Sequence, residues 1–271
     1  MNPADQFASE VRDNIEKLGK ARALRELSLT WLRDIGPYKY PYNFTWLGRP
    51  IIQLPQDILA LQEIVWAVRP DLIIETGIAH GGSLILSASL LALLDICEFG
   101  EATAAPNSGK PRRVIGVDID IRAHNREALN SHPLRRRLEL VEGSSIDTGV
   151  IERVRREASG HERILVCLDS NHTHEHVLQE LEAYAPLVSV DSYCVVFDTA
   201  IEDMPDGMFP DRPWRKGDNP KTAVREFLRR LETEGRSGCD GTPLKMEIDK
   251  VIDNKLLISV APDGYLKRIG R

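Results

Sequence analysis

A buried-strand pattern that runs through glycines into a helix is the feature that most constrains this chain. Residues 72–74, Leu-Ile-Ile, form a short apolar run of the kind that a fully buried parallel strand shows. Gly77, Gly81 and Gly82 follow, and residues 84–95 have the composition of a buried helix. A strand, a glycine turn and a helix N-terminus direct backbone N–H groups toward a negative group. The pattern predicts an α/β chain that binds a carboxylate or phosphate at this turn, although a plain tight βα turn carries the same glycines.

The spacing of the glycines decides between cofactors. A dinucleotide-binding turn requires G-x-G-x-x-G, whereas three residues separate Gly77 from Gly81 here. Glu75 ends the first strand and Asp118 ends the next one, VIGVD, and two such acids suit a nucleoside with a free ribose diol. This is the layout of S-adenosylmethionine (SAM) methyltransferases, so we expect SAM as the cofactor.

Composition excludes several other classes of protein. The chain has 271 residues, 42% hydrophobic and 28% charged, as in ordinary soluble globular proteins. A net charge of −6 argues against a dedicated nucleic-acid binder, which would carry a basic surface. The N-terminus lacks the apolar stretch of a signal peptide, and no apolar run reaches the roughly 18 residues that suggest a membrane span. We therefore expect a cytoplasmic protein with neither a membrane span nor a nucleic-acid partner.

Strands and helices alternate along most of the chain, which predicts a parallel sheet with helices on both faces. The expected strands cover residues 72–76, 114–120, 138–145, 164–170 and 193–199, and the expected helices cover residues 58–69, 84–95, 121–133, 172–188 and 222–235. The strand-like runs 244–252 and 255–261, joined through Asp253-Asn254, predict a C-terminal antiparallel hairpin. Together these elements predict a Rossmann-like class I methyltransferase fold.

The remaining segments are less regular. Residues 4–34 have helical spacing that Gly36-Pro37 ends, and an aromatic, proline-rich stretch follows that we expect to lie across another part of the molecule. We divide the chain into an N-terminal helical cover segment, 1–44, and a methyltransferase domain, 45–271. Residues 98–113 read as a surface loop, and residues 201–219 read as a long loop of the kind that is functional or disordered.

Polar residues collect at the carboxyl ends of the predicted strands, where open α/β sheets bind ligands. Methyl transfer to a hydroxyl needs a group that removes a proton, and His172, three residues after Asp169, suits that role. Asp169 and Asp198, at neighbouring strand ends, are candidate ligands of Mg²⁺. For His174 and His176 a solvated helix start is the favoured interpretation, although His172 and His176 lie one helical turn apart, a spacing that metal sites use.

These motifs resemble the cephalosporin hydroxylase/rhamnosyl O-methyltransferase family. The resemblance rests on IIETGIAHGGS, VIGVDIDIR, LDSNH, and YCVVFDT with its proline-rich loop, and covers approximately residues 45–262. It implies SAM-dependent, Mg²⁺-dependent methylation of a sugar hydroxyl on a small molecule or glycan, by a homo-oligomer. The implied roles are Glu75, Gly77 and Ser83 around the methionine part of SAM, Asp118 at the ribose, Ser144 and Ser145 near the adenine, Asp169 and Asp198 at the metal, and His172 with Asp169 in catalysis.

One departure from the family pattern concerns the metal. Phe197 precedes Asp198 where the family has a glutamate, so one carboxylate is missing and metal dependence is an open question. Glu202 or Asp203 could replace it, or His172 could act without a metal. The alternative function is a non-catalytic binding or scaffold protein, which Phe197 favours. An iron-dependent hydroxylase would need a two-histidine-one-carboxylate motif of the form H-x-D or H-x-E, which is not recognisable here.

Overall fold

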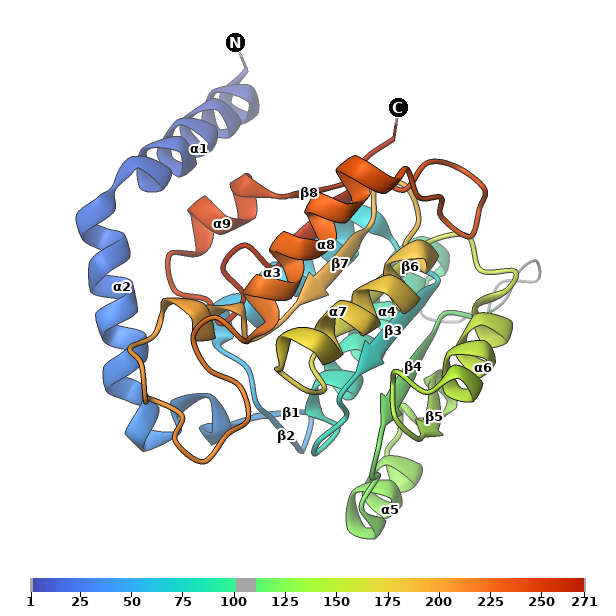
Figure 1. Cartoon of the computed structure of the whole chain (residues 1–271). Coiled ribbons are helices and arrows are strands. Elements are labelled where there is room, and N and C mark those ends of the chain that lie inside the picture. Colours follow the sequence, from blue (N-terminus) through green and yellow to red (C-terminus); the bar gives the residue numbers. More distant parts are fainter. Residues whose placement is uncertain (1, 101–110, 271) are drawn as a thin grey trace.

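A seven-stranded, mostly parallel sheet forms the centre of this computed structural model, which describes residues 2–100 and 111–270 (Figure 1). The strand order is β5-β4-β3-β6-β7-β9-β8, and only β9 runs in the opposite direction, antiparallel to β7 and β8. The strands are β3 (Leu72–Thr76), β4 (Arg113–Asp118), β5 (Leu138–Glu142), β6 (Ile164–Leu168), β7 (Tyr193–Val196), β8 (Met246–Ile248) and β9 (Tyr265–Arg268). This arrangement confirms the predicted class I methyltransferase fold.

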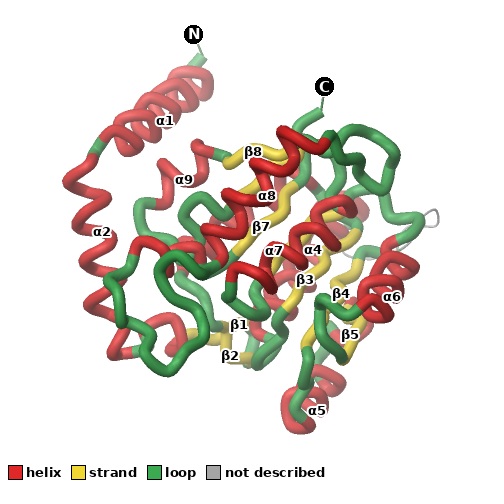
Figure 2. Tube along the Cα trace, in the orientation of Figure 1, coloured by secondary structure: helices red, strands yellow, loops and turns green. Residues whose placement is uncertain are grey.

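Helices cover both faces of the sheet and create two hydrophobic cores (Figures 1 and 2). The helices of the domain are α3 (Pro55–Val68), α4 (Gly82–Phe99), α5 (Ala123–Ser131), α6 (Thr148–Ala158), α7 (His174–Tyr184), α8 (Pro220–Glu234) and α9 (Lys250–Leu256). Because side chains alternate along a strand, Ile73 packs into the core with α3 and α4, while Leu72 and Ile74 pack into the core with α6, α7 and α8. The expected helices on both faces are confirmed.

Helix α4 is apolar because it is a core helix. Its mean hydropathy is 1.7 over 18 residues, and among the described residues it alone is long and apolar enough to cross a membrane. More than half of it is buried inside the fold, where Leu84, Leu86 and Leu91 join the core of one sheet face. Its apolar sequence is therefore accounted for by packing against the sheet.

The N-terminal segment lies along one edge of the domain (Figure 1). Its elements are α1 (Pro3–Lys20), α2 (Arg22–Ile35), two short 3₁₀ turns (Gly36–Tyr38 and Tyr40–Asn43) and an antiparallel pair, β1 (Phe44–Trp46) with β2 (Arg49–Ile51). No residue of α1 is buried, and the Arg25 guanidinium donates a 2.6 Å hydrogen bond to Asn254 of α9. The predicted helix stop at Gly36 is confirmed. The boundary after residue 44 falls at the first residue of β1 and stays a prediction.

The predicted hairpin is wrong in its second strand. Of residues 255–261, the first two end α9 and the rest are irregular. Helix α9 begins at residue 250, inside the first predicted strand, because the Asp249 side chain accepts hydrogen bonds from the N–H groups of Val251 and Ile252 and so caps a helix. The partner of β8 is β9, which begins at Tyr265. Antiparallel pairing at the C-terminus is therefore confirmed, but α9 replaces the tight turn that we predicted at Asp253-Asn254.

The structure also differs from the predictions at α6 and at the start of α7. Helix α6 was not predicted, although Asp147 caps it and Arg155 and Arg156 occupy its last turn. Helix α7 begins at His174, so His172 lies in the preceding loop rather than in a helix. Most of the surface loop predicted at 98–113 lies outside the described residues.

Candidate functional site

A cavity of about 660 Å³ opens at the carboxyl ends of β3, β6 and β7. Asp169, His172 and Asp198 line it on one side, together with residues 77–80 of the glycine turn. Other parts of its wall come from α2, the segment that follows α2, and the long loop after β7. These wall residues are Leu32, Ile35, Lys39, Pro41, Tyr42, Met204, Met208, Phe209, Arg212 and Trp214. The volume lies within the 300–1,000 Å³ usual for small-molecule sites.

The glycine turn brings backbone close to the cavity. Gly77 has φ +88°, and a Cβ there would lie 1.9 Å from the carbonyl oxygen of Asp169, so only glycine fits. Gly81, also at positive φ, is the N-cap of α4 and supplies no side-chain cap to its first turn. The first N–H groups of α4 therefore face the cavity region without a capping side chain, as the predicted anion-binding turn requires.

Glu75 lies beneath this turn rather than in the cavity. Its side chain is buried, and the Ser83 hydroxyl donates a hydrogen bond to it. Burial raises the pKa of Glu75 to about 7, although the bond from Ser83 opposes the shift. Ser83 lines the cavity, so this pair links the buried carboxyl to the cavity wall.

Asp118 stands beside the same turn, on the neighbouring strand. One of its carboxylate oxygens accepts hydrogen bonds from the N–H groups of Ile78 and Ala79 at 2.8 and 3.1 Å. The turn is also held from outside, because Asn125 donates to the Ala79 carbonyl and Arg49 donates to the His80 carbonyl. The two predicted acids, Glu75 and Asp118, thus lie at adjacent strand ends around one fixed turn.

Ser145 belongs to a half-buried polar cluster behind the cavity. Its hydroxyl lies 3.0 Å from Nε2 of His176, and the Tyr184 hydroxyl donates to its carbonyl oxygen. Ser170 joins the cluster by lying 3.2 Å from His176 and donating to the buried Glu180. Neither Ser144 nor Ser145 lines the cavity, and Ser144 contributes a carbonyl that accepts from the N–H of Asp147.

The predicted solvated helix start is wrong for both later histidines. His176 is bonded within the cluster around Ser145, and Nδ1 of His174 lies 2.8 Å from the Thr222 hydroxyl of α8. Both side chains are therefore used to pack α7 against its neighbours. They are not part of the group around Asp169.

Asp169, His172 and Asp198 come together at the ends of β6 and β7. Their ligand atoms lie within 4.8 Å of one another, and Nε2 of His172 is 3.0 Å from Oδ2 of Asp198. Burial raises the pKa of Asp169 well above its usual range, and the negative charges of Asp198 and Glu75 add to this shift. Two carboxylates and an imidazole with such crowded negative charge form a donor set that fits a divalent cation.

The surroundings of Phe197, Glu202 and Asp203 show whether a third carboxylate joins Asp169 and Asp198. Phe197 is packed in the core beside Tyr193 and Val195, with 3% of its surface exposed. Glu202 accepts hydrogen bonds from residues 217 and 219, and Asp203 is paired with Lys221. The hypothesis that Glu202 or Asp203 completes the metal site is therefore wrong for this conformation.

The cavity also contains residues that sequence reasoning missed. The Trp214 and His172 rings form a T-shaped pair with centroids 4.6 Å apart, and the Arg212 guanidinium lies 5.2 Å from the Trp214 centroid. Trp214 and Arg212 belong to the loop 201–219 that the sequence marks as functional or disordered, whereas no sequence pattern singles out Lys39, which also lines the cavity from the segment that follows α2. Only the aromatic, proline-rich composition around Tyr42 signalled that this segment lies across another part of the molecule.

Comparisons with known proteins agree with this geometry. The sequence model of the family described as rhamnosyl O-methyltransferase/CmcI matches residues 38–269. The rhamnosyl O-methyltransferase of Mycobacterium bovis (strain BCG / Pasteur 1173P2) is 28% identical over 226 residues, 83% of this chain and 78% of the relative. The rhamnosyl O-methyltransferase of Mycobacterium leprae (strain TN) is 25% identical over 225 residues, 83% of this chain and 82% of the relative.

Solved structures share the fold. A CmcI structure with Mg and SAM superposes with a TM-score of 0.53 at 19% identity, covering 84% of this chain and 78% of that one. An apo structure of CmcI gives a TM-score of 0.51 at 18% identity, with 85% and 78% covered. Since the family match extends over most of the chain, this protein belongs to the rhamnosyl O-methyltransferase/CmcI family.

Proposed function

We propose that this protein transfers a methyl group from SAM to a hydroxyl of a sugar. Its membership of a family named for rhamnosyl O-methylation supports the reaction class. The single observation that carries the proposal is the meeting of Asp169, His172 and Asp198 in one cavity with the glycine turn. Such a cavity can hold a nucleoside cofactor and an acceptor hydroxyl side by side.

The glycine-turn side fits SAM. The uncapped first turn of α4 can accept the methionine carboxylate, with Ser83 beside it and Glu75 behind Ser83. The family resemblance implies that Asp118 would bind the ribose hydroxyls and that Ser144 and Ser145 would lie near the adenine. Bound SAM would supply an electrophilic methyl group on a sulfonium.

His172 is the proposed general base. When Nε2–H of the neutral ring donates to Asp198, the lone pair lies on Nδ1, which takes the proton of the acceptor hydroxyl. The hydroxyl oxygen then forms the new bond to the methyl carbon as the carbon–sulfur bond breaks. Asp198 stabilises the resulting imidazolium, as a carboxylate does when it orients a catalytic histidine.

Asp169 and Asp198 are the proposed ligands of Mg²⁺. Their crowded negative charge fits a hard cation, and a CmcI structure contains Mg with SAM. When bound, the ion would lower the pKa of an acceptor hydroxyl. We expect Asp169→Asn and Asp198→Asn each to weaken Mn²⁺ binding, measured by electron paramagnetic resonance with Mn²⁺ as a substitute for Mg²⁺. Unchanged Mn²⁺ affinity in both variants would remove the metal from the proposal.

Calorimetry with SAM and S-adenosylhomocysteine (SAH), followed by methyl-transfer assays on a set of glycosides, tests the function. Binding of both nucleosides and transfer to at least one glycoside is the expected result. No binding at millimolar concentrations contradicts it. SAM binding without transfer, with or without Mg²⁺, would favour the alternative of a non-catalytic binding protein, which the buried Phe197 supports. A homo-oligomer and a cytoplasmic location stay predictions.

A further inference from the structure

The loop between β7 and α8 forms much of the cavity wall and is held by hydrogen bonds and ion pairs at its two ends. Residues 204–216 contain no helix and no named strand, yet five of them line the cavity. These are Met204, Met208, Phe209, Arg212 and Trp214. Figures 1 and 2 show the loop beside α2. A loop of this length must be held by specific contacts to keep one conformation.

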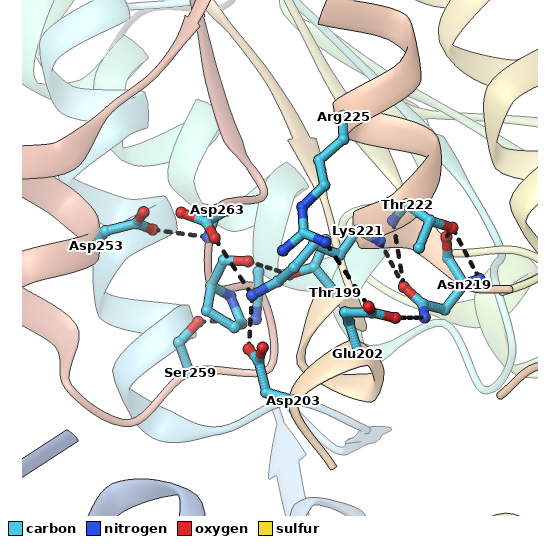
Figure 3. Close-up of polar contacts among 12 residues, drawn as sticks. Thr199, Glu202, Asp203, Asn219, Lys221, Thr222, Arg225, Asp253, Ser259 and Asp263 are labelled. Carbon is cyan, nitrogen blue, oxygen red and sulfur yellow. Dashed lines mark hydrogen bonds and ion pairs between the residues drawn. The ribbon is translucent and has the colours of Figure 1, made fainter. Parts of the chain in front are cut away.

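Glu202 joins the two ends of this loop. Its Oε2 accepts a 2.8 Å hydrogen bond from the N–H of Gly217. The same oxygen accepts a 2.6 Å hydrogen bond from the side-chain amide of Asn219 (Figure 3). Burial would raise the pKa of Glu202, but these bonds and the charge of Arg225 outweigh burial and lower it. The carboxylate is therefore charged at neutral pH and accepts both bonds in its stronger, ionised form.

Asn219 is fixed at the other end of this contact. It is fully buried, and its side-chain oxygen accepts from the N–H groups of Lys221 and Thr222 as the N-cap of α8. Its amide nitrogen donates to Glu202 and to the Arg215 carbonyl. Every contact of the amide favours the same orientation, so α8 acts as a rigid support for the end of the loop.

A second contact holds the start of the loop. The Lys221 ammonium, 3% exposed as a residue, lies 2.6 Å from Oδ2 of Asp203 and 3.3 Å from Oδ2 of Asp263 (Figure 3). Since Lys221 belongs to α8 and Asp263 precedes β9, this pairing attaches the loop start to the body of the domain. Glu202 thus holds the end of the loop through Gly217 and Asn219, and Asp203 holds its start through Lys221.

The fastened loop end reaches the proposed base. Asp218 accepts a 2.8 Å hydrogen bond from the N–H of His174, the first residue of α7, whose own N-cap supplies no side-chain bond. Two residues before His174, the His172 ring makes a T-shaped contact with Trp214. The segment that Glu202 holds therefore contacts the chain on both sides of residue 173, through Asp218 at His174 and through Trp214 at His172.

We propose that Glu202 is a positioning residue, which closes loop 204–216 so that Trp214 packs against His172 and forms the platform for the acceptor sugar. The identity of the acceptor as a sugar rests on the proposed function, whereas the contacts that hold the loop do not. It predicts that Glu202 acts on acceptor binding through Trp214, without touching substrate itself.

Limited trypsin digestion tests the fastening without any activity. The bonds after Arg215 and Lys216 are exposed sites inside the closed turn, where Arg215 and Asp218 exchange backbone hydrogen bonds. Glu202→Ala should speed cleavage at these bonds about tenfold or more, because cleavage requires local opening. Glu202→Gln keeps an oxygen that can accept both bonds and should restore most of the protection. Glu226→Ala, which removes the ion pairs with Arg229 and Arg230 on α8, is the matched control.

A double-mutant cycle tests the route through Trp214, with SAH-loaded protein and p-nitrophenyl α-L-rhamnopyranoside as the probe. Glu202→Ala and Trp214→Ala should each weaken probe binding about tenfold and leave SAH affinity unchanged, and the double variant should be no weaker than Trp214→Ala. Additive losses, or a parallel loss of SAH affinity in Glu202→Ala, overturn the proposed route. Equal trypsin cleavage of Glu202→Ala and wild type overturns the fastening. Failure of the wild type to bind SAH refutes the proposed function instead, and the trypsin result stands apart from it.

Discussion

The two sides of the cavity are built on different principles. The glycine-turn side consists of strand ends and backbone, and Gly77, Asp118 and the start of α4 are fixed by hydrogen bonds within one βα unit and its neighbour. The opposite side consists of side chains from α2, its following turns and loop 204–216, brought together from distant parts of the sequence. The backbone of the first side is therefore fixed by local hydrogen bonds, whereas the shape of the second side depends on long-range contacts such as those of Glu202. We therefore expect mutations on the two sides to separate cofactor binding from acceptor binding.

The largest expected effect comes from the point where the two sides meet. Replacing His172 by Ala should lower methyl transfer by roughly 10²–10⁴-fold, the usual contribution of a positioned general base. SAH affinity should not change, because His172 contacts Trp214 of loop 204–216 and is not among the residues proposed to hold SAM. Calorimetry and initial rates measure both quantities. His124→Ala, an exposed histidine on α5, is the control; retained activity in His172→Ala would exclude this residue as the base.

A pair of glycine substitutions contrasts the two sides in stability. Gly77→Ala combines positive φ with a clash against the Asp169 carbonyl, whereas Gly207 has positive φ in open space. Gly207→Ala should cost about 1 kcal/mol of unfolding free energy from backbone strain alone, and Gly77→Ala more than about 3 kcal/mol. Urea denaturation measures both. Equal losses would show that the turn can relax and that the first side is less rigid than proposed.

The same contrast explains which parts could be predicted from sequence. The strands at 72–76, 164–170 and 193–199 carry dense apolar runs that end in acids, and the local pattern sufficed because parallel strand ends converge at one edge. The contacts of Trp214, His174 and Glu202 were not predictable, since they depend on how α7, α8 and the loop pack together. The error at residues 250–256 has a related cause: a short apolar run fits a strand or a helix, and the side-chain cap at Asp249 selects the helix.

Glu75 should make stability depend on pH. Its folded-state pKa of about 7 lies above the ordinary value of 4.5, so the folded state binds the proton more tightly. Stability is unaffected below pH 4.5 and falls as the pH rises toward 7, by about 3 kcal/mol for a shift of this size. Glu75→Gln, which can still accept the hydrogen bond from Ser83, should remove that decline. Denaturation at pH 5 and pH 8 tests it, and an identical decline in the variant would assign the effect to other buried acids such as Asp57.

The smallest expected effect concerns the outer support of the glycine turn. Asn125 is buried, donates a 2.9 Å hydrogen bond to the Ala79 carbonyl and accepts one from Arg49. Asn125→Ala should weaken SAH binding about tenfold, equivalent to about 1.4 kcal/mol, because the turn loses a bond that holds its shape. Asn130→Ala, also on α5, removes an exposed contact with Arg135 and should change nothing. Binding of the rhamnoside probe should be unaffected, and an equal loss there would mean that the two sides of the cavity are energetically coupled.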